Sequence, residues 1–246
     1  MKRFKWHILI GLLLISLSAL FYFIHYLIFG DPHHIFIYMV GDIAFVPIEV
    51  LLVSLIIERL LHEREKRIML NKMNMVIGAF YSEVGTKLLK YGSGFSSQTE
   101  KVAKEFKTIK DWTDSEFIVT SKKIKSYEHQ IDIDKGNVEE LRSFLTERRS
   151  FLLLILQNPN LLEHETFTEL LWAVFHLTEE LAKREDVKNL SDKDNEHLAG
   201  DIKRAYTLLI SEWLDYMKHL KGKYPYLFSL AVRTNPFDPT ASVEMK

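Results

Sequence analysis

The chain has 246 residues, a formal net charge of -1 at pH 7 and no cysteine. Without cysteine there are no disulfides, thiolate metal sites or cysteine nucleophiles, and the near-neutral charge argues against bulk nucleic-acid binding, which needs a concentrated basic face. Hydrophobic residues make up 47% of the chain and are concentrated in its first sixty positions, so the remaining length suits one cytosolic domain.

The first apolar segment, residues 6–29, contains no Asp, Glu, Lys or Arg. A membrane span needs about 20 apolar residues to cross the hydrocarbon core, so this segment is long enough. A cleaved signal peptide is the alternative, since Lys2, Arg3 and Lys5 precede the segment. We favour a retained span, because the run is longer than a typical signal-peptide core and no small-residue cleavage site follows it.

A second apolar segment, about residues 35–57, follows the turn signal Gly30, Asp31, Pro32. We therefore expect residues 1–62 to form a tight transmembrane helical hairpin. Basic residues precede the first span and follow the second, whereas the connecting loop has no Lys or Arg. The positive-inside rule then predicts a two-pass protein of the inner (plasma) membrane, with both termini in the cytoplasm.

Both spans contain polar residues that are costly to place in lipid. Asp42 and Glu49 are seven residues apart and share one face of the second span, and Pro47 between them should kink it. A polar stripe at helical spacing on the first span offers them partners: His7, Gly11, Ser18, Tyr22 and His25. In an antiparallel hairpin, Tyr22 and His25 lie at about the depth of Asp42, and Ser18 lies near Glu49.

Two interpretations of these polar groups remain open. They form a hydrogen-bonded seam between the two helices, or, after oligomerisation, Asp42 and Glu49 line a pore or proton path. At the outer surface, His33 and His34 lie near Asp31 and His25 and could bind a metal or sense pH. Their spacing is not that of a known metal site, so no metal is assigned to them.

The rest of the chain predicts a cytosolic antiparallel helical bundle over residues 63–233 and a mobile C-terminal tail over 234–246. Residues 54–91 contain no proline, so the second span should continue as one helix beyond the membrane surface and end at 92–94. Later helices should begin at Thr113 or Asp114, after Asn137, near Thr166 and after Ser191. The expected fold class is therefore all-α.

A lysine-rich stretch between residues 98 and 127 is the main charged feature of the domain. Its lysines could form a solvated face or dock on the anionic inner leaflet, although the interspersed acidic residues weaken the docking interpretation. The candidates for leaflet contact are Lys101, Lys104, Lys107, Lys110, Lys122, Lys123 and Lys125.

No motif in the sequence predicts catalysis. Glu169, His176 and Glu180 have helical spacing, but the chain lacks Glu-x-x-His and His-Glu-x-x-His, so we interpret them as a solvated face. A Walker A loop, a dinucleotide fingerprint, a nucleophile elbow and a kinase signature set are also missing. We therefore assign no catalytic residue, metal or cofactor.

The sequence favours a membrane-anchored scaffold protein whose bundle binds a protein partner or self-associates, with the lipid bilayer as its other partner. The alternative is a small oligomeric ion channel or transport accessory, in which Asp42 and Glu49 line the path. An enzyme is the least favoured class.

Overall fold

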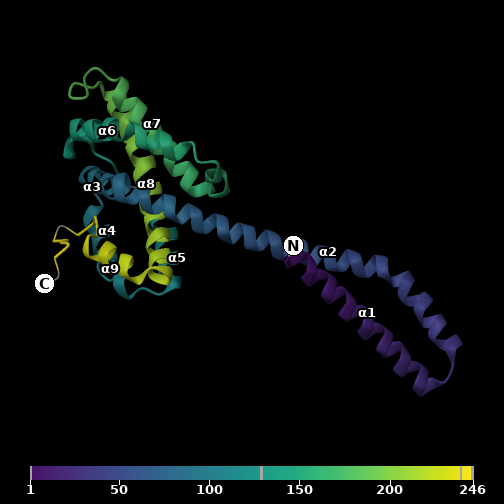
Figure 1. The fold of residues 1–246 in the computed structure, drawn as a ribbon. Coiled ribbons are helices and arrows are strands. Elements are labelled where there is room, and N and C mark those ends of the chain that lie inside the picture. Colours follow the sequence, from purple (N-terminus) through teal and green to yellow (C-terminus); the bar gives the residue numbers. More distant parts are fainter. Residues whose placement is uncertain (1, 128–129, 239, 245–246) are drawn as a thin grey trace. The chain divides into compact units, whose positions relative to one another are not determined.

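The computed structural model describes the whole chain except residues 1, 128–129, 239 and 245–246 (Figure 1). The described residues are helical and contain no β-strand; an isolated bridge joins Ser96 and Ile131. The expected all-α fold class is therefore confirmed. The chain divides into two compact units, Met1–Glu65 and Lys66–Lys246.

The first unit contains α1 (Lys2–Phe29) and the first part of α2 (Pro32–Phe80). Gly30 joins the two helices at the predicted turn, with a φ of 63° that a glycine adopts without steric cost. Its backbone N–H donates to the Tyr26 carbonyl at 2.8 Å and caps α1. By length and composition both helices are apolar enough to cross a membrane, and none of their most apolar windows is buried within the chain.

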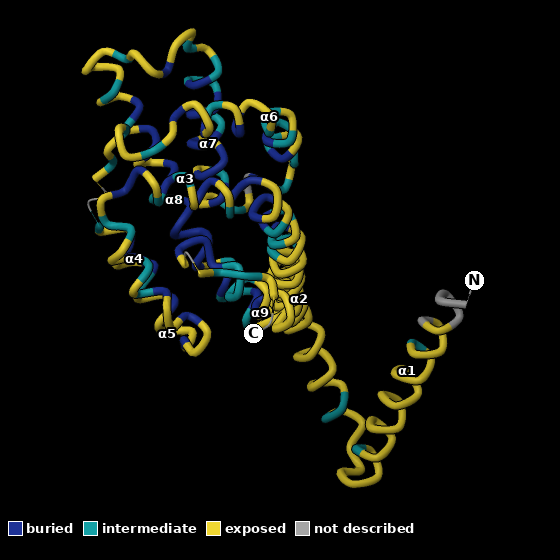
Figure 2. Tube along the Cα trace, turned by 90° about the vertical axis from the view of Figure 1, so that its left-hand side faces the viewer, coloured by how far each residue is buried: buried dark blue, intermediate teal, exposed yellow. Residues whose placement is uncertain are grey.

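The second helix does not end where its apolar part ends. α2 continues as one α-helix through Pro47 to Phe80, and its last part enters the core of the second unit through Met73, Ile77 and Phe80. Figure 2 colours the residues by burial. The helix α1 is almost wholly exposed, whereas the interior of the second unit is buried. The second apolar segment therefore continues into the domain as a helix, as expected.

A π-helical segment, η1 (Tyr81–Gly85), separates α2 from α3 (Thr86–Phe95). The single helix expected over residues 54–91 is therefore interrupted, and α3 ends at Phe95, just beyond the glycines expected to stop it. The Thr86 hydroxyl donates to the Tyr81 carbonyl at 2.8 Å, which satisfies a backbone acceptor at the irregular turn. Short π-helical insertions of this kind are frequent at functional sites.

In the described part of the second unit, six further α-helices follow, with three short 3-10 helices between them. The α-helices are α4 (Thr99–Phe106), α5 (Asp114–Lys125), α6 (Val138–Leu156), α7 (Glu165–Lys183), α8 (Asp192–Lys223) and α9 (Pro225–Arg233). The 3-10 helices are η2 (Ile109–Asp111), η3 (Ile133–Lys135) and η4 (Pro159–Glu163).

Side-chain caps fix the starts of three helices at predicted residues. Thr113 and Glu116 form a reciprocal capping box at α5, and Asn137 accepts from the Glu140 backbone at α6. Ser191 caps α8 in the same way. These starts are readable from sequence because the capping bonds are local.

The long helix α8 is the centre of the second unit. It packs against α3, α5, α7 and α9, and its buried residues from Leu198 to Leu220 are mainly apolar. A helix with neighbours on several sides can hold polar groups away from water, which is the condition for the site described below.

The C-terminal segment is partly packed in the core. Phe237 is 3% exposed, and its ring lies 4.8 Å from that of Phe106 and 5.4 Å from that of Trp213, centroid to centroid. Asn235 is also buried, and its side-chain oxygen accepts from the Phe237 backbone. Residues 235–237 thus differ from the mobile tail expected over 234–246, because an aromatic anchor holds them.

Candidate functional site

The polar residues of the two N-terminal helices meet in part. Ser18, Tyr22 and His25 of α1 line one pocket with Asp42 of α2. Glu49 does not line it, and the expected closeness of Ser18 to Glu49 stays a prediction. His25 Nε2 is 3.4 Å from Nδ1 of His34, so two of the outer histidines are paired.

The seven candidate lysines for leaflet contact are all exposed. Two of them also contact protein groups: Lys123 Nζ is 2.6 Å from Glu105 Oε1, and Lys101 Nζ lies 4.2 Å from the centre of the Tyr127 ring. Burial favours the protonated form of Glu105, but hydrogen bonds from Lys123 and the Tyr127 hydroxyl lower its pKa overall. Docking of the lysines on an anionic leaflet stays a prediction.

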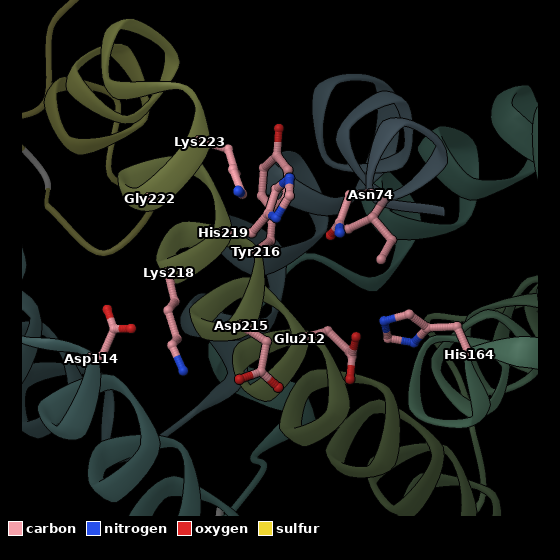
Figure 3. Close-up of a pocket in the computed structure, with 11 residues that line it drawn as sticks. Asn74, Asp114, His164, Glu212, Asp215, Tyr216, Lys218, His219, Gly222 and Lys223 are labelled. Carbon is pink, nitrogen blue, oxygen red and sulfur yellow. The ribbon is translucent and has the colours of Figure 1, made fainter. Parts of the chain in front are cut away.

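A pocket of about 400 Å³ opens inside the second unit, beside the C-terminal half of α8 (Figure 3). It draws residues from the end of α2, the start of α5, the start of α7 and one face of α8. Its lining residues are Asn74, Ile77, Asp114, His164, Glu212, Asp215, Tyr216, Lys218, His219, Gly222 and Lys223.

Two carboxyl groups one helical turn apart dominate the chemistry of this pocket. Glu212 is 2% exposed, and burial raises its pKa to about 7, with a further contribution from the Asp215 carboxylate. Burial also raises the pKa of Asp215, although Lys125 and Lys218 oppose the shift. Glu212 can therefore hold or release a proton near neutral pH, which an exposed glutamate cannot do.

The pKa values of two histidines in the pocket are shifted downward, opposite to those of the two acids. Burial lowers the pKa of His164, and burial together with Lys223 lowers that of His219. His164 Nδ1 accepts the Phe167 backbone N–H at 3.3 Å, so the cap of α7 fixes the ring. In Figure 3 the His164 ring and the Glu212 carboxyl point toward each other, and each of these two groups favours its neutral form.

Stacked tyrosines connect this pocket with the π-helical segment. The ring of Tyr216 stacks on that of Tyr81 at 5.3 Å, and the Tyr81 hydroxyl donates to the Leu209 carbonyl at 2.9 Å. Burial, followed by Glu212 and Asp215, raises the pKa of Tyr81. The π-helical segment η1 thus places the Tyr81 side chain against α8, close enough to Glu212 and Asp215 to feel their charge.

Sequence reasoning did not identify this pocket. Glu212, Asp215 and His164 belong to no motif, and their contributing helices lie far apart in the sequence. Glu212 is buried among the apolar packing residues of α8, and an acid inside such a stripe is the signal that could have pointed to the pocket.

A second group of side chains could hold a metal ion. His176 and Glu180 of α7 offer ligand atoms within 4.8 Å of one another and of His197 on α8. Glu169, grouped with them by helical spacing, instead lines a separate pocket with Gly200. The spacing placed His176 and Glu180 on one face, which the sequence reasoning interpreted as solvated, and the packing of α7 on α8 adds His197.

Comparisons with known proteins agree with the two-part structure. The model of the N-terminal helical domain of MJ1433 matches residues 2–61, and the model of the C-terminal helical domain of uncharacterized protein MJ1433 matches residues 69–233. Uncharacterized protein MJ1433 of Methanocaldococcus jannaschii is 48% identical over 234 residues, covering 95% of this chain and 94% of the relative. No solved structure matches. The chain belongs to the MJ1433 family.

Proposed function

We propose that the chain is a membrane-anchored interaction protein. Its two N-terminal helices form a two-span hairpin in the cell membrane, and its helical domain binds a protein partner at the cytoplasmic face. The supporting observation is the change in burial along α2, whose apolar part is exposed while Met73, Ile77 and Phe80 are buried. A contiguous apolar surface of this extent needs a cover, and lipid is the cover that suits two helices of membrane-spanning length.

The basic residues support an orientation of the proposed hairpin in the membrane. Arg59, Arg64, Lys66 and Arg67 follow the second apolar segment, whereas the loop at Gly30 has no basic residue. The domain that follows then lies in the cytoplasm. Its surface carries exposed Trp172 and Tyr226, residue types enriched in protein interfaces.

Two experiments test this function in order. The full chain should stay with membranes after alkaline extraction, whereas residues 66–246 alone should be soluble and folded. A partner captured by crosslinking in cells and then purified should bind residues 66–246 saturably, with an affinity close to that for the full chain. Release of the full chain by alkaline washing would contradict the anchor, and a partner that binds only the hairpin would contradict the role of the domain.

A second candidate function rests on the pocket lined by Ser18, Tyr22, His25 and Asp42. If several hairpins assemble, this polar face could line an ion path, since polar groups inside a span face protein or water. A monomer cannot build a pore from two helices, so the oligomeric state in lipid is the first measurement. The reconstituted parent should then conduct ions, and Asp42→Asn should alter its selectivity. A silent parent excludes the channel.

A further inference from the structure

Four side chains of α7 and α8 form a cluster outside the pocket of Figure 3. His176 and Glu180 are one turn apart on α7, and His197 and Asp201 are one turn apart on α8. Because α7 packs against α8, the two pairs meet across the helix interface. We call these four residues the α7–α8 cluster. Residues at i and i+4 lie on one face of a helix, so each helix presents two ligands together.

Two distances within the cluster match those between ligands of one tetrahedral metal ion. Asp201 Oδ2 lies 3.4 Å from His176 Nε2 and 3.4 Å from His197 Nε2. Bonds of about 2.0–2.1 Å to a tetrahedral Zn²⁺ give ligand-to-ligand edges of about 3.3–3.4 Å. His197 Nε2 is 3.9 Å from Glu180 Oε2, about half an ångström wider than such an edge.

Asp201 supplies an independent sign that the cluster is made for a ligand. Its side chain is only 5% exposed, and Oδ2 forms no hydrogen bond with any described residue. Leaving a buried carboxylate oxygen without a hydrogen bond is costly, and native proteins seldom do so without a functional reason. Both imidazole Nε2 atoms lie near the same oxygen, so one cation among the three atoms would satisfy it.

The surrounding charges support the carboxylates without covering the cluster. Arg184 donates to Glu180 Oε2 at 2.8 Å and, with its other terminal nitrogen, lies 3.3 Å from Asp194. Arg204 lies 4.0 Å from Asp201 Oδ1, the oxygen that does not face the histidines. Hydrogen-bonded outer partners of this kind orient ligating carboxylates in metal sites. Since Glu180 is already held by Arg184, it is the least firm of the four ligands.

We propose that the α7–α8 cluster binds a first-row transition-metal dication, with Zn²⁺ as the best match. His176, His197 and Asp201 supply three ligands, and Glu180 or a water supplies the fourth. Imidazole nitrogen with carboxylate oxygen suits Zn²⁺ and its neighbours, whereas Ca²⁺ and Mg²⁺ prefer oxygen alone. His176 and His197 are 46% and 55% exposed, so the ion can enter from solvent. The bound ion joins α7 to α8.

Zinc titration of the metal-stripped full chain in detergent tests the proposal. The expected result is one tight site per chain by calorimetry and by elemental analysis of the washed protein. His197→Ala should weaken binding by more than about tenfold, because it removes a direct ligand and even outer partners contribute 10–100-fold. This histidine is half exposed, so its loss does not threaten folding.

The matched control is His34→Ala, which removes a histidine of the N-terminal unit whose Nδ1 lies 3.4 Å from His25 Nε2. It should leave the stoichiometry and affinity unchanged. Co²⁺ gives a second readout, since a four-coordinate site with histidine ligands should show visible absorption that Asp201→Asn changes. The proposal is overturned if the parent shows no saturable zinc binding, or if His197→Ala binds zinc as the parent does.

Discussion

Glu212 has a raised pKa that cannot be predicted from its neighbours in the sequence. It lies on α8 among apolar neighbours, 2% exposed, and burial raises its pKa to about 7. The folded pKa is therefore above the 4.5 of an unperturbed glutamate, so the native state binds a proton that the unfolded chain releases. The carboxylate form costs stability, and the cost grows as the pH rises from about 4.5 to about 7.

Glu212→Gln should remove this pH dependence. Above pH 7 the variant of residues 66–246 should be more stable than the parent, by at most about 3 kcal/mol, and the two should converge near pH 4.5. Urea denaturation at both pH values measures this. Glu196→Gln, an exposed position on the same helix, is the control and should change neither value. A difference in stability between the parent and Glu212→Gln that stays the same between pH 5 and pH 7 would contradict the raised pKa.

Two glycines of α3 give a matched test of packing at single residues. A Cβ at Gly92 would overlap the Tyr206 ring, whereas a Cβ at Gly94 would meet nothing within 4 Å. Gly92→Ala should therefore destabilise the domain by about 1–3 kcal/mol through overpacking. Gly94→Ala should be neutral or stabilising by up to about 1 kcal/mol, since alanine favours a helix. Thermal unfolding measures the stability of both variants. Equal destabilisation of the two would disprove the Tyr206 contact.

At the scale of elements, helix starts depend on neighbouring residues in the sequence, whereas the irregular segment η1 depends on tertiary contacts. The starts of α5, α6 and α8 follow from capping residues next to them in the sequence. The π-helical segment η1 does not, because its reason is tertiary: Tyr81 stacks on Tyr216 and donates to Leu209, both on α8. An extra residue in the turn rotates the following helix, so α2 and α3 each direct their own apolar face into the core.

The C-terminal segment is an element of the core, and its anchor can be removed. Phe237→Ala should destabilise the domain by about 3 kcal/mol, because the ring packs against Phe106 and Trp213 and its loss leaves a cavity. Val243→Ala, at a residue that is 64% exposed, is the control and should have little effect. Urea denaturation measures both. A Phe237→Ala domain as stable as the parent would mean that the segment contributes nothing to the core.

At the scale of the whole molecule, the two units have opposite relations to solvent. The apolar side chains of Met1–Glu65 are exposed, whereas those of Lys66–Lys246 form a continuous core. A folded unit without a core of its own needs another medium to cover it, which is the physical basis of the proposed anchor.

The chain lacks cysteine, so its proposed topology can be mapped with single cysteines and no background. A membrane-impermeant maleimide should label Asp31→Cys in intact cells, because the proposed topology puts the loop between the helices outside. Ser126→Cys, in the domain, should react only after permeabilisation. Labelling of Ser126→Cys in intact cells would reverse the orientation, and labelling of neither variant after permeabilisation would show that the probe sites are covered.

The sequence by itself determined the properties that depend on local composition and spacing. These are the all-α class, the apolar N-terminal helices, the turn at Gly30 and the helix starts at Thr113, Asn137 and Ser191. They are local because capping, turn geometry and hydrophobic periodicity act within a few residues.

Only the tertiary structure decided which distant groups meet. The packing of α8 against α5 and α7 buries Glu212, and the same interface brings His197 and Asp201 to His176. Neither group has a motif, because each of its helices contributes ordinary residues at ordinary spacing. The raised pKa of Glu212 arises from burial, and the closeness of His176, His197 and Asp201 arises from contact across helices. Both depend on how the helices dock rather than on any one segment.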